Sequence, residues 1–432
     1  MEKTTPKKQS KKKAKSLENF GNVHGMYDIL PKDAEWWRAV WDTGKMLSDL
    51  YDFHYIETPV LEHAELFIRG NGASDGIEKK LFMLKTRDNE QVSLRADLSA
   101  PVMRSYIQHH LGYFASPLKI YQNGSIFRFE KIDDGKLRQV HQWGFDVIGD
   151  NDPVYDMQII LAAFEFLKIL KFQNLRLRIN TAGCKVCRTS YREKLKVYYR
   201  KQPMCATCKT DLEENPMRLF NCTKTECRES RKEAPIILDH LCQGCNNHFK
   251  AVLELVEDNG IVYEPDPFFV REKEYCNRTI FEIMSSDTHF ALAGGGRYDY
   301  LAEALFGKTI PGVGVALGLD RIVEQLRIKN VELRRKMKPR VAFMAVGDQA
   351  RKMSVRLMNM LRMGGVGVVE AIGKKTLKAQ MKFAEKSHVP MSLIFGQKEA
   401  FENTIIVRDM KSGAQETFIV DTFVEQVKKR LK

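Results

Sequence analysis

The sequence predicts an α+β protein in three parts: a core of strands and helices, a cysteine-rich module inserted into that core, and a separate small α/β domain at the C-terminal end. Three observations lead to this fold class. Strand-like segments with alternating polar residues are interspersed with helical patterns. Eight of the nine cysteines fall between Cys184 and Cys245. Strands alternate with helices over the last 93 residues, which is typical of an independent α/β domain.

The part boundaries follow changes in composition. Residues 1–18 hold seven Lys against two Glu, carry +5 of the formal +14 net charge, and are predicted to be a disordered tail. The remaining boundaries are as follows: core, 19–182 and 261–330; cysteine-rich insertion, 183–260; basic linker, 331–339; C-terminal domain, 340–432.

Periodicity predicts the individual elements. In the core we expect helices over 34–50 and 156–172, a strand over 53–61, a strand over 91–99 that runs into a helix near Ser99, and strands over 174–180, 279–285 and 289–296. Residues 312–326 should form a glycine-rich strand that passes into a helix. The C-terminal domain should contain strands over 340–346, 366–370, 391–395 and 404–409, and helices over 350–362, 377–386 and 422–431.

One hairpin, Ile126 to Gly149, carries polar residues along a whole face, because strand side chains alternate with period 2. Buried charges need partners, so such a face predicts a polar ligand, although a solvated face on an edge hairpin is the alternative. The residues of the face, with those that neighbouring segments would add, are Arg95, Asp97, Ser99, Arg128, Glu130, Arg138, Gln142, Asp146 and Arg271.

The residue types on this face indicate the ligand chemistry. Arginine binds phosphate oxygens through paired hydrogen bonds, whereas carboxylates with Gln and Ser can hold a primary ammonium. The combination suits an amino acid beside a nucleoside triphosphate, with the amino acid's carboxylate attacking the α-phosphorus. The net charge of +14 favours a polyanionic partner such as nucleic acid.

Several motifs resemble the class II aminoacyl-tRNA synthetases, and within them the histidyl-tRNA synthetase family. Residues 51–70 resemble motif 1, with Pro59 as its dimer-interface proline, 127–142 resemble motif 2, and "GVGVALGLDRI" resembles motif 3. "LAGGGRYDYL" and "VREKEYC" resemble the family's two histidine signatures. Residues 393–415 resemble its anticodon-binding domain.

The resemblance implies a catalytic core on a mixed, mainly antiparallel sheet with flanking helices. It implies a histidine–tRNA ligase that activates L-histidine with ATP and Mg²⁺ to histidyl-adenylate and then transfers histidine to the 3′ end of tRNA(His). It also implies a cytoplasmic homodimer. No run of about 18 apolar residues occurs, so a membrane partner is not expected.

The resemblance also assigns roles to individual residues. Arg128, Arg271 and Arg321 would bind the ATP phosphates, and Glu130 would lie on the nucleotide side. Asp97, Ser99 and Gln142 would hold the α-amino group of histidine, whereas Asp146 and Tyr298 would contact its imidazole. In the motif 2 turn, Lys136 and Arg138 would contact the acceptor end of the tRNA, and Asp133 and Asp134 would face away from RNA or read base amino groups.

"VREKEYC" departs from the family's Val-Arg-Gly-Leu-Asp-Tyr-Tyr. Glu272, Lys273 and Glu274 replace Gly-Leu-Asp, and Cys276 replaces a tyrosine that helps to close the imidazole pocket. We therefore expect weaker histidine binding, which Cys276→Tyr should improve. The departure supports a second hypothesis, a catalytically weak synthetase-like regulatory protein that binds tRNA or histidine.

The cysteines form four pairs with spacing suited to zinc. Buried free thiols, redox pairs and a zinc-ribbon nucleic-acid binder are the alternatives, the last of which explains only the insertion. Eight cysteine ligands would form one or two structural zinc sites. The sequence does not decide among the three possible groupings of the four pairs. The ligands would be Cys184, Cys187, Cys205, Cys208, Cys222, Cys227, Cys242 and Cys245. The basic helix 191–201 is a hypothetical contact for the tRNA acceptor arm.

Overall fold

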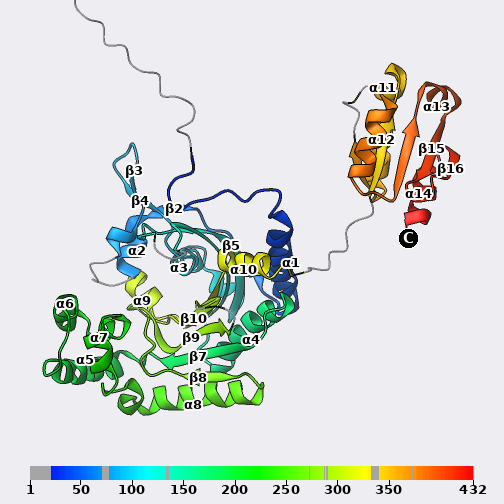
Figure 1. The fold of residues 1–432 in the computed structure, drawn as a ribbon. Coiled ribbons are helices and arrows are strands. Elements are labelled where there is room, and N and C mark those ends of the chain that lie inside the picture. The colour runs from blue at the N-terminus through cyan, green and yellow to red at the C-terminus, as the bar shows by residue number, and fades with distance from the viewer. Residues whose placement is uncertain are drawn as a thin grey trace, which may run out of the picture. The chain divides into compact units, whose positions relative to one another are not determined.

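The computed structural model describes residues 21–70, 77–132, 136–271, 273–286, 288, 290–331, 340–370, 374 and 376–431. The chain divides into two compact units between Leu333 and Arg334 (Figure 1). Among the described residues, none of the helices has the length and apolar character needed to span a bilayer.

The first unit is built on an eight-stranded mixed sheet in the order β1-β5-β6-β11-β10-β9-β7-β8. The five central pairings are antiparallel, and only the outermost strands, β1 and β8, pair parallel with their neighbours. The predicted mixed, mainly antiparallel sheet is therefore confirmed. The strands are β1 (His54–Tyr55), β5 (Leu118–Phe127), β6 (Gln139–Ile148), β7 (Leu175–Thr181), β8 (Tyr263–Pro265), β9 (Asn277–Ser285), β10 (Ala293–Arg297) and β11 (Gly312–Gly318).

Helices cover one face of this sheet and bury its apolar side chains. Trp143, Phe145 and Val147 of β6 lie in the main hydrophobic core, where helix residues such as Trp37 and Phe166 join them. The intervening residues of β6 point to the opposite face, so the period-2 pattern leaves that face for polar groups. The helices that contribute to this core are α1 (Ala34–Leu50), α4 (Pro153–Ile169), α8 (Gln243–Asp258) and α10 (Leu319–Ile328).

A smaller sheet, in the order β2-β4-β3, packs against a helix, α2, whose Leu66 and Phe67 lie in a second hydrophobic cluster. Its strands are β2 (Leu61–His63), β3 (Met83–Lys85) and β4 (Gln91–Leu94). The helices of this region are α2 (Ala64–Gly70), α3 (Ser99–Gln108), α9 (Leu301–Phe306) and the short 3₁₀ helices η2 (Glu78–Lys80) and η3 (Leu111–Tyr113).

The cysteine-rich region is helical, and α5, α6 and α7 gather at one corner of the first unit (Figure 1). These helices surround a hydrophobic cluster of their own that includes Tyr191, Tyr199 and Phe220. Helix α8 then returns to the core and contacts α4 and β9. The elements are α5 (Lys185–Tyr199), α6 (Ala206–Glu214), η4 (Pro216–Asn221), α7 (Thr225–Arg231) and η5 (Ile237–His240).

The second unit is the predicted α/β domain, with a five-stranded sheet in the order β13-β12-β14-β15-β16. The sequence prediction missed β16, whose residues are mostly exposed and lack an apolar alternation, and α13, which has only six residues. The elements are β12 (Arg340–Ala345), α11 (Asp348–Met363), β13 (Gly367–Glu370), α12 (Leu377–Lys386), β14 (Met391–Phe395), α13 (Gln397–Glu402), β15 (Thr404–Asp409), β16 (Gln415–Ile419) and α14 (Phe423–Leu431).

The predicted strand over 91–99 is wrong in its second half. Strand β4 ends at Leu94, and Asp97 accepts the N–H of Ala100 at 3.0 Å at the start of α3. Arg95 is 4% exposed and donates to the carbonyls of Thr58 and Ser125 at 2.8 Å each. Arg95 is therefore a structural cation inside the protein, because buried carbonyls bind its guanidinium.

The polar hairpin is confirmed as β5 and β6, but its strands end sooner than predicted. Strand β5 stops at Phe127 and β6 starts at Gln139. Arg128 and Arg138 lie just beyond these ends, where the N–H of Arg128 still donates to the carbonyl of Arg138 at 2.8 Å.

Candidate active site

The buried carboxylate of Asp146 lies on the polar face of the large sheet, near the C-terminal end of β6. Its Oδ1 accepts the hydroxyl of Tyr298 at 2.6 Å, and the aspartate is 4% exposed. The register places Gly314 of β11 directly beside Asp146. A Cβ at Gly314 would lie 2.1 Å from Asp146 Oδ1, so the glycine leaves the space that this carboxylate occupies.

Burial raises the pKa of Asp146 to about 6, because an ionised carboxylate loses its hydration there. Hydrogen bonding from Tyr298 and Gln122 lowers this pKa, whereas the negative charge of Asp97 raises it further. Asp146 is therefore mostly ionised at neutral pH, and it can accept a hydrogen bond from the N–H of a ligand.

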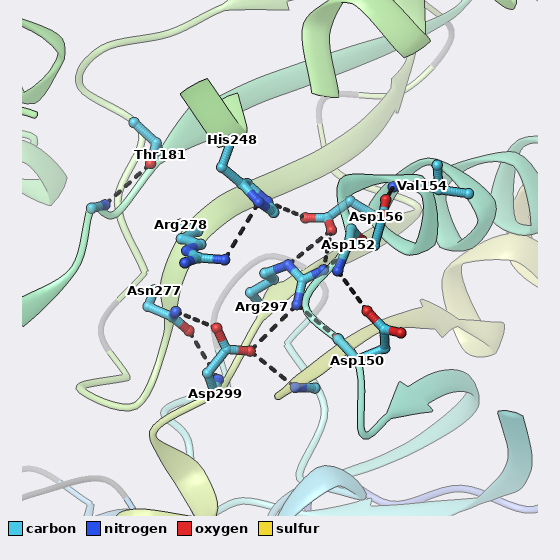
Figure 2. A network of polar contacts seen from close by, with 12 residues as sticks. Asp150, Asp152, Val154, Asp156, Thr181, His248, Asn277, Arg278, Arg297 and Asp299 are labelled. Atoms are coloured by element: carbon cyan, nitrogen blue, oxygen red, sulfur yellow. Dashed lines mark hydrogen bonds and ion pairs between the residues drawn. The ribbon is translucent and has the colours of Figure 1, made fainter. Parts of the chain in front are cut away.

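A buried polar network fixes the main chain on both sides of Tyr298 (Figure 2). Arg297, which is 0% exposed, donates through Nε to Asp156 Oδ2 at 2.8 Å. Asp299 accepts from Asn277 at 2.6 Å and from the N–H of Gly312 at 2.9 Å. Figure 2 shows Arg297 among these carboxylates, with His248 of α8 reaching Asp156 from the other side. The network therefore holds Tyr298 in place against Asp146.

A second carboxylate, Asp97, is bound by a cation from the segment that departs from the family motif. Lys273 Nζ lies 2.7 Å from Asp97 Oδ2, and the Tyr275 hydroxyl lies 3.5 Å from the same oxygen. Burial alone would raise the pKa of Asp97, but Lys273, the N–H of Ala100 and the charge of Arg128 bring it below its usual value. Sequence reasoning missed Lys273 and Tyr275 as contact residues, although the departure of "VREKEYC" marked the segment.

Three half-buried arginines border the polar face, each with a nitrogen on a main-chain carbonyl. Arg128 Nε donates to Ala96 at 2.8 Å. Arg271 Nη2 donates to Phe281 at 2.8 Å, and Arg321 Nη1 donates to Ala291 at 3.3 Å. These bonds set the orientation of the guanidinium groups, which is what a phosphate-binding role requires.

The start of α10, which carries Arg321, is fixed to β6. Asp320 accepts the main-chain N–H of His141 at 2.6 Å and lies 2.9 Å from the ring Nδ1 of His141. The Tyr27 hydroxyl donates to the same carboxylate at 2.5 Å. The start of α10 is therefore anchored at His141, the residue that precedes Gln142.

The structure brings some of the predicted site residues together. Lys273 contacts Asp97, Tyr298 contacts Asp146, and Arg128 donates to the main-chain carbonyl of Ala96, which precedes Asp97. Cys276 packs against the hydrophobic cluster that contains Tyr298, and burial raises the pKa of its thiol, whereas the charges of Lys273 and Arg271 lower it.

The other predicted residues lie at the ends of the hairpin or at its margin. Ser99 begins α3, and Gln142 lies on β6 opposite Gly318 and Gly124. Glu130 is 3.7 Å from Lys80, Lys136 is exposed, and Arg138 lies 3.9 Å from the ring of Phe129. Among the described residues, no hydrogen bond or ion pair joins Asp97 or Asp146 to Glu130, Lys136, Arg138 or Arg321. Asp133 and Asp134 lie outside the described residues.

Comparison with known proteins identifies the family. A model of the histidyl-tRNA synthetase family matches residues 25–188 and 217–322, and a model of an anticodon binding domain matches 340–430. The chain belongs to the histidyl-tRNA synthetase family. It is therefore an aminoacyl-tRNA synthetase with the class II fold.

Relatives in this family resemble the chain over nearly its whole length. It is 35% identical to the histidine–tRNA ligase of Natranaerobius thermophilus over 410 residues, which covers 94% of this chain and 97% of the relative. It is also 35% identical to that of Clostridium novyi over 394 residues, covering 90% and 94%. The crystal structure of apo S. aureus histidyl-tRNA synthetase superposes with a TM-score of 0.78 at 29% identity, covering 94% of this chain and 99% of that one.

The eight cysteines of this synthetase gather into two groups of four. One group is Cys184, Cys187, Cys242 and Cys245, and the other is Cys205, Cys208, Cys222 and Cys227. Within each group the sulfur atoms lie within 4.8 Å of one another. The match to the family model is interrupted from 189 to 216, a range that includes Cys205 and Cys208.

The sulfur geometry suits tetrahedral coordination. Tetrahedral zinc with bonds of about 2.3 Å places sulfur atoms about 3.8 Å apart. Cys184 Sγ lies 3.5 Å from Cys187 Sγ and 3.8 Å from Cys242 Sγ, and Cys205 Sγ lies 3.9 Å from Cys222 Sγ. None of these distances is that of a disulfide, whose sulfur atoms are about 2.05 Å apart.

Proposed function

We propose that the polar face around Asp97, Asp146 and Tyr298 binds L-histidine and activates it with ATP. The chain is a histidine–tRNA ligase, which forms histidyl-adenylate with release of pyrophosphate and then transfers histidine to the 3′ end of tRNA(His). The observation that carries the assignment of this face is the buried pair of Asp146 and Tyr298.

Asp146 is the residue we assign to the imidazole. Its carboxylate accepts a ring N–H, and the hydroxyl of Tyr298 keeps it oriented and favours its ionised form. At neutral pH the imidazole is mostly uncharged and has one N–H donor, so a single buried acceptor suits it. Asp97, Ser99 and Gln142 are assigned to the α-ammonium of histidine.

The arginines Arg128, Arg271 and Arg321 are assigned to the ATP phosphates, with Glu130 on the nucleotide side. Mg²⁺ enters with ATP and supplies further positive charge at the phosphates. The carboxylate of histidine attacks the α-phosphorus, so these residues act by aligning the two reactants and by neutralising charge that develops on the phosphate oxygens. This description needs no covalent bond to the enzyme.

The tRNA contacts are proposed from the positions of two parts of the chain. Lys136 and Arg138, which directly precede β6 in the motif 2 hairpin, are assigned to the acceptor end of tRNA(His). The unit that matches the anticodon binding domain is assigned to the anticodon.

We further propose a homodimer, because residues 51–70 resemble motif 1, and we propose a cytoplasmic location. Light scattering that gives the mass of a single chain would contradict the dimer.

We assign these roles to the following divisions of the chain: tail, 1–18; catalytic core, 19–182 and 261–330; cysteine-rich insertion, 183–260; linker, 331–339; anticodon-binding domain, 340–432.

We assign one structural zinc ion to each group of four cysteines. Main-chain N–H groups support the thiolates, since Cys242 N donates to Cys187 Sγ at 3.0 Å and Cys205 N donates to Cys227 Sγ at 3.3 Å. Four cysteines fill a tetrahedral shell, so the ions would stabilise the insertion and take no part in the reaction.

Metal analysis of the purified protein tests the zinc assignment. We expect two zinc ions per chain, and one in a Cys205→Ser variant. Cys276→Ser is the matched control, because Cys276 belongs to neither group, and it should keep both ions. Less than one zinc per chain, in protein that has not met a chelator, would refute the assignment.

Histidine-dependent exchange of pyrophosphate into ATP tests the proposed use of the polar face. We expect exchange with L-histidine and its loss in Asp146→Ala. A synthetase-like regulatory protein is the alternative, for which "VREKEYC" is the supporting feature. It predicts histidine or tRNA binding without exchange, and that outcome would replace the proposal.

A further inference from the structure

Lys273 occupies the position that the proposed function gives to the α-ammonium of histidine. Its Nζ lies 2.7 Å from Asp97 Oδ2 and 2.5 Å from the Tyr275 hydroxyl. A lysine Nζ and an α-ammonium are the same kind of group, a compact cation with three N–H donors. The two cations therefore compete for one carboxylate.

The second oxygen of Asp97 already has a main-chain partner. Oδ1 accepts the N–H of Ala100 at 3.0 Å, and this bond belongs to the turn that starts α3. Oδ2 is the oxygen left for a ligand, and it is the oxygen to which Lys273 is bonded. The side chain of Asp97 is only 8% exposed, whereas that of Lys273 is 30% exposed, so the lysine can withdraw toward solvent while Asp97 stays in place.

The cysteine-rich insertion holds the segment that carries Lys273. Arg192 Nη2 lies 2.6 and 2.8 Å from the two carboxylate oxygens of Glu274, and Asn215 donates to Glu274 at 3.0 Å. Arg188 Nη1 donates to the main-chain carbonyls of Glu274 at 2.8 Å and Cys276 at 3.0 Å. These contacts fix the residues that follow Lys273, and they thereby favour the conformation in which Lys273 contacts Asp97.

We propose that Lys273 is a built-in competitor for the α-ammonium of the amino acid substrate. The proposal rests on the assignment of Asp97 to that ammonium in the proposed function. Histidine binds productively only when Lys273 leaves Asp97, so the apparent affinity falls by the fraction of molecules in which Asp97 is open. The residue thereby sets the histidine concentration at which the enzyme works.

The test compares ligands with and without an ammonium group in Lys273→Met. Titration calorimetry without ATP should show L-histidine and L-histidinol binding about threefold to tenfold more tightly than to the unaltered protein. Imidazole-4-propionate has the imidazole and carboxylate but no ammonium, and its affinity should stay the same or fall. The KM for histidine in pyrophosphate exchange should fall by the same factor as the dissociation constant of histidine.

Two further variants separate competition from a general change in structure. Lys273→Arg keeps a cation and should keep the KM of the unaltered protein for histidine. Lys168→Met is the matched control, since it removes a lysine that pairs with Glu165 on α4 at 2.8 Å, and it should change none of the affinities.

Two outcomes would overturn the proposed competition alone, and a third would overturn the proposed function as well. If the unaltered protein exchanges pyrophosphate with histidine but Lys273→Met binds histidine no more tightly, the proposed competition is wrong and the proposed function stands. Equal tightening for imidazole-4-propionate would also overturn the competition, because it would show a general loosening of the pocket. Absence of histidine binding and exchange in every variant would overturn the proposed function as well.

Discussion

Removal of the Tyr298 hydroxyl should shift the pH range over which the enzyme binds histidine. In Tyr298→Phe, the buried carboxylate of Asp146 loses a donor at 2.6 Å that favours its ionised form. A hydrogen bond to a charged group contributes about 1.5–3 kcal/mol. Since one pKa unit corresponds to about 1.4 kcal/mol, the pKa of Asp146 should rise by about one to two units.

The expected loss of binding follows from the ionised fraction. With a pKa of about 6, Asp146 is about nine-tenths ionised at pH 7. A rise of one to two units lowers that fraction to about one half or one tenth at the same pH. The KM for histidine at pH 7 should therefore rise by about twofold to tenfold from ionisation alone, and most of the loss should disappear near pH 9.

Pyrophosphate exchange measured from pH 5.5 to 9 gives this profile. Titration of free histidine, near pH 6.5, is common to both proteins and cancels in their ratio. Tyr191→Phe is the matched control, because it removes another buried tyrosine hydroxyl, one that donates to the carbonyl of Pro235 at 2.8 Å in the insertion. An unshifted profile in Tyr298→Phe, or an equal shift in Tyr191→Phe, would refute the role assigned to the pair.

Three further changes have defined outcomes. Asp146→Asn should abolish most exchange but stabilise the first unit. Because the pKa of Asp146 is raised in the folded state, its ionised carboxylate lowers the free energy of unfolding, and the variant removes this cost. The increase in the free energy of unfolding should therefore grow from about pH 4 to about pH 6 and level off near 3 kcal/mol at most. Arg297→Met should destabilise the first unit by about 3–5 kcal/mol, because the buried carboxylate of Asp156 loses the cation that pairs with it. Arg178→Met removes a partly exposed ion pair with Asp266 and should cost under about 1 kcal/mol. Tryptophan fluorescence in urea measures both, since all four tryptophans lie in the first unit, and equal costs for the two arginines would contradict the argument. Deletion of residues 1–18 should weaken tRNA binding mainly at low salt if the tail acts through its charge, and a loss that does not depend on salt would contradict this.

The fold was predictable from the sequence where burial imposes a clear period. Helix α1 and strands β14 and β15 match their expected bounds, and the hairpin of β9 and β10 forms as predicted. Short or exposed elements gave no such pattern, as β16 and α13 show. The strand predicted through Asp97 and Ser99 failed because alternating polar residues there serve a turn and a helix start.

The candidate site could be predicted only as a set of residue types. The period of β6 placed Gln142 and Asp146 on one face, but the spacing could not show that Gly314 provides the room for Asp146. Nor could it show that Lys273 reaches Asp97, because 176 residues separate the two and the contact depends on the tertiary fold. The grouping of the four cysteine pairs, which the sequence left open, depends on the fold in the same way.

Aminoacylation of a tRNA(His) transcript with labelled L-histidine tests the central claim most directly. We predict ATP-dependent charging by the unaltered protein, with little charging by Asp146→Ala, which should still bind the tRNA. Charging should also require the transcript's free 3′ terminal ribose. Tight tRNA binding by the unaltered protein without any charging would contradict the account, and would favour a synthetase-like regulatory protein.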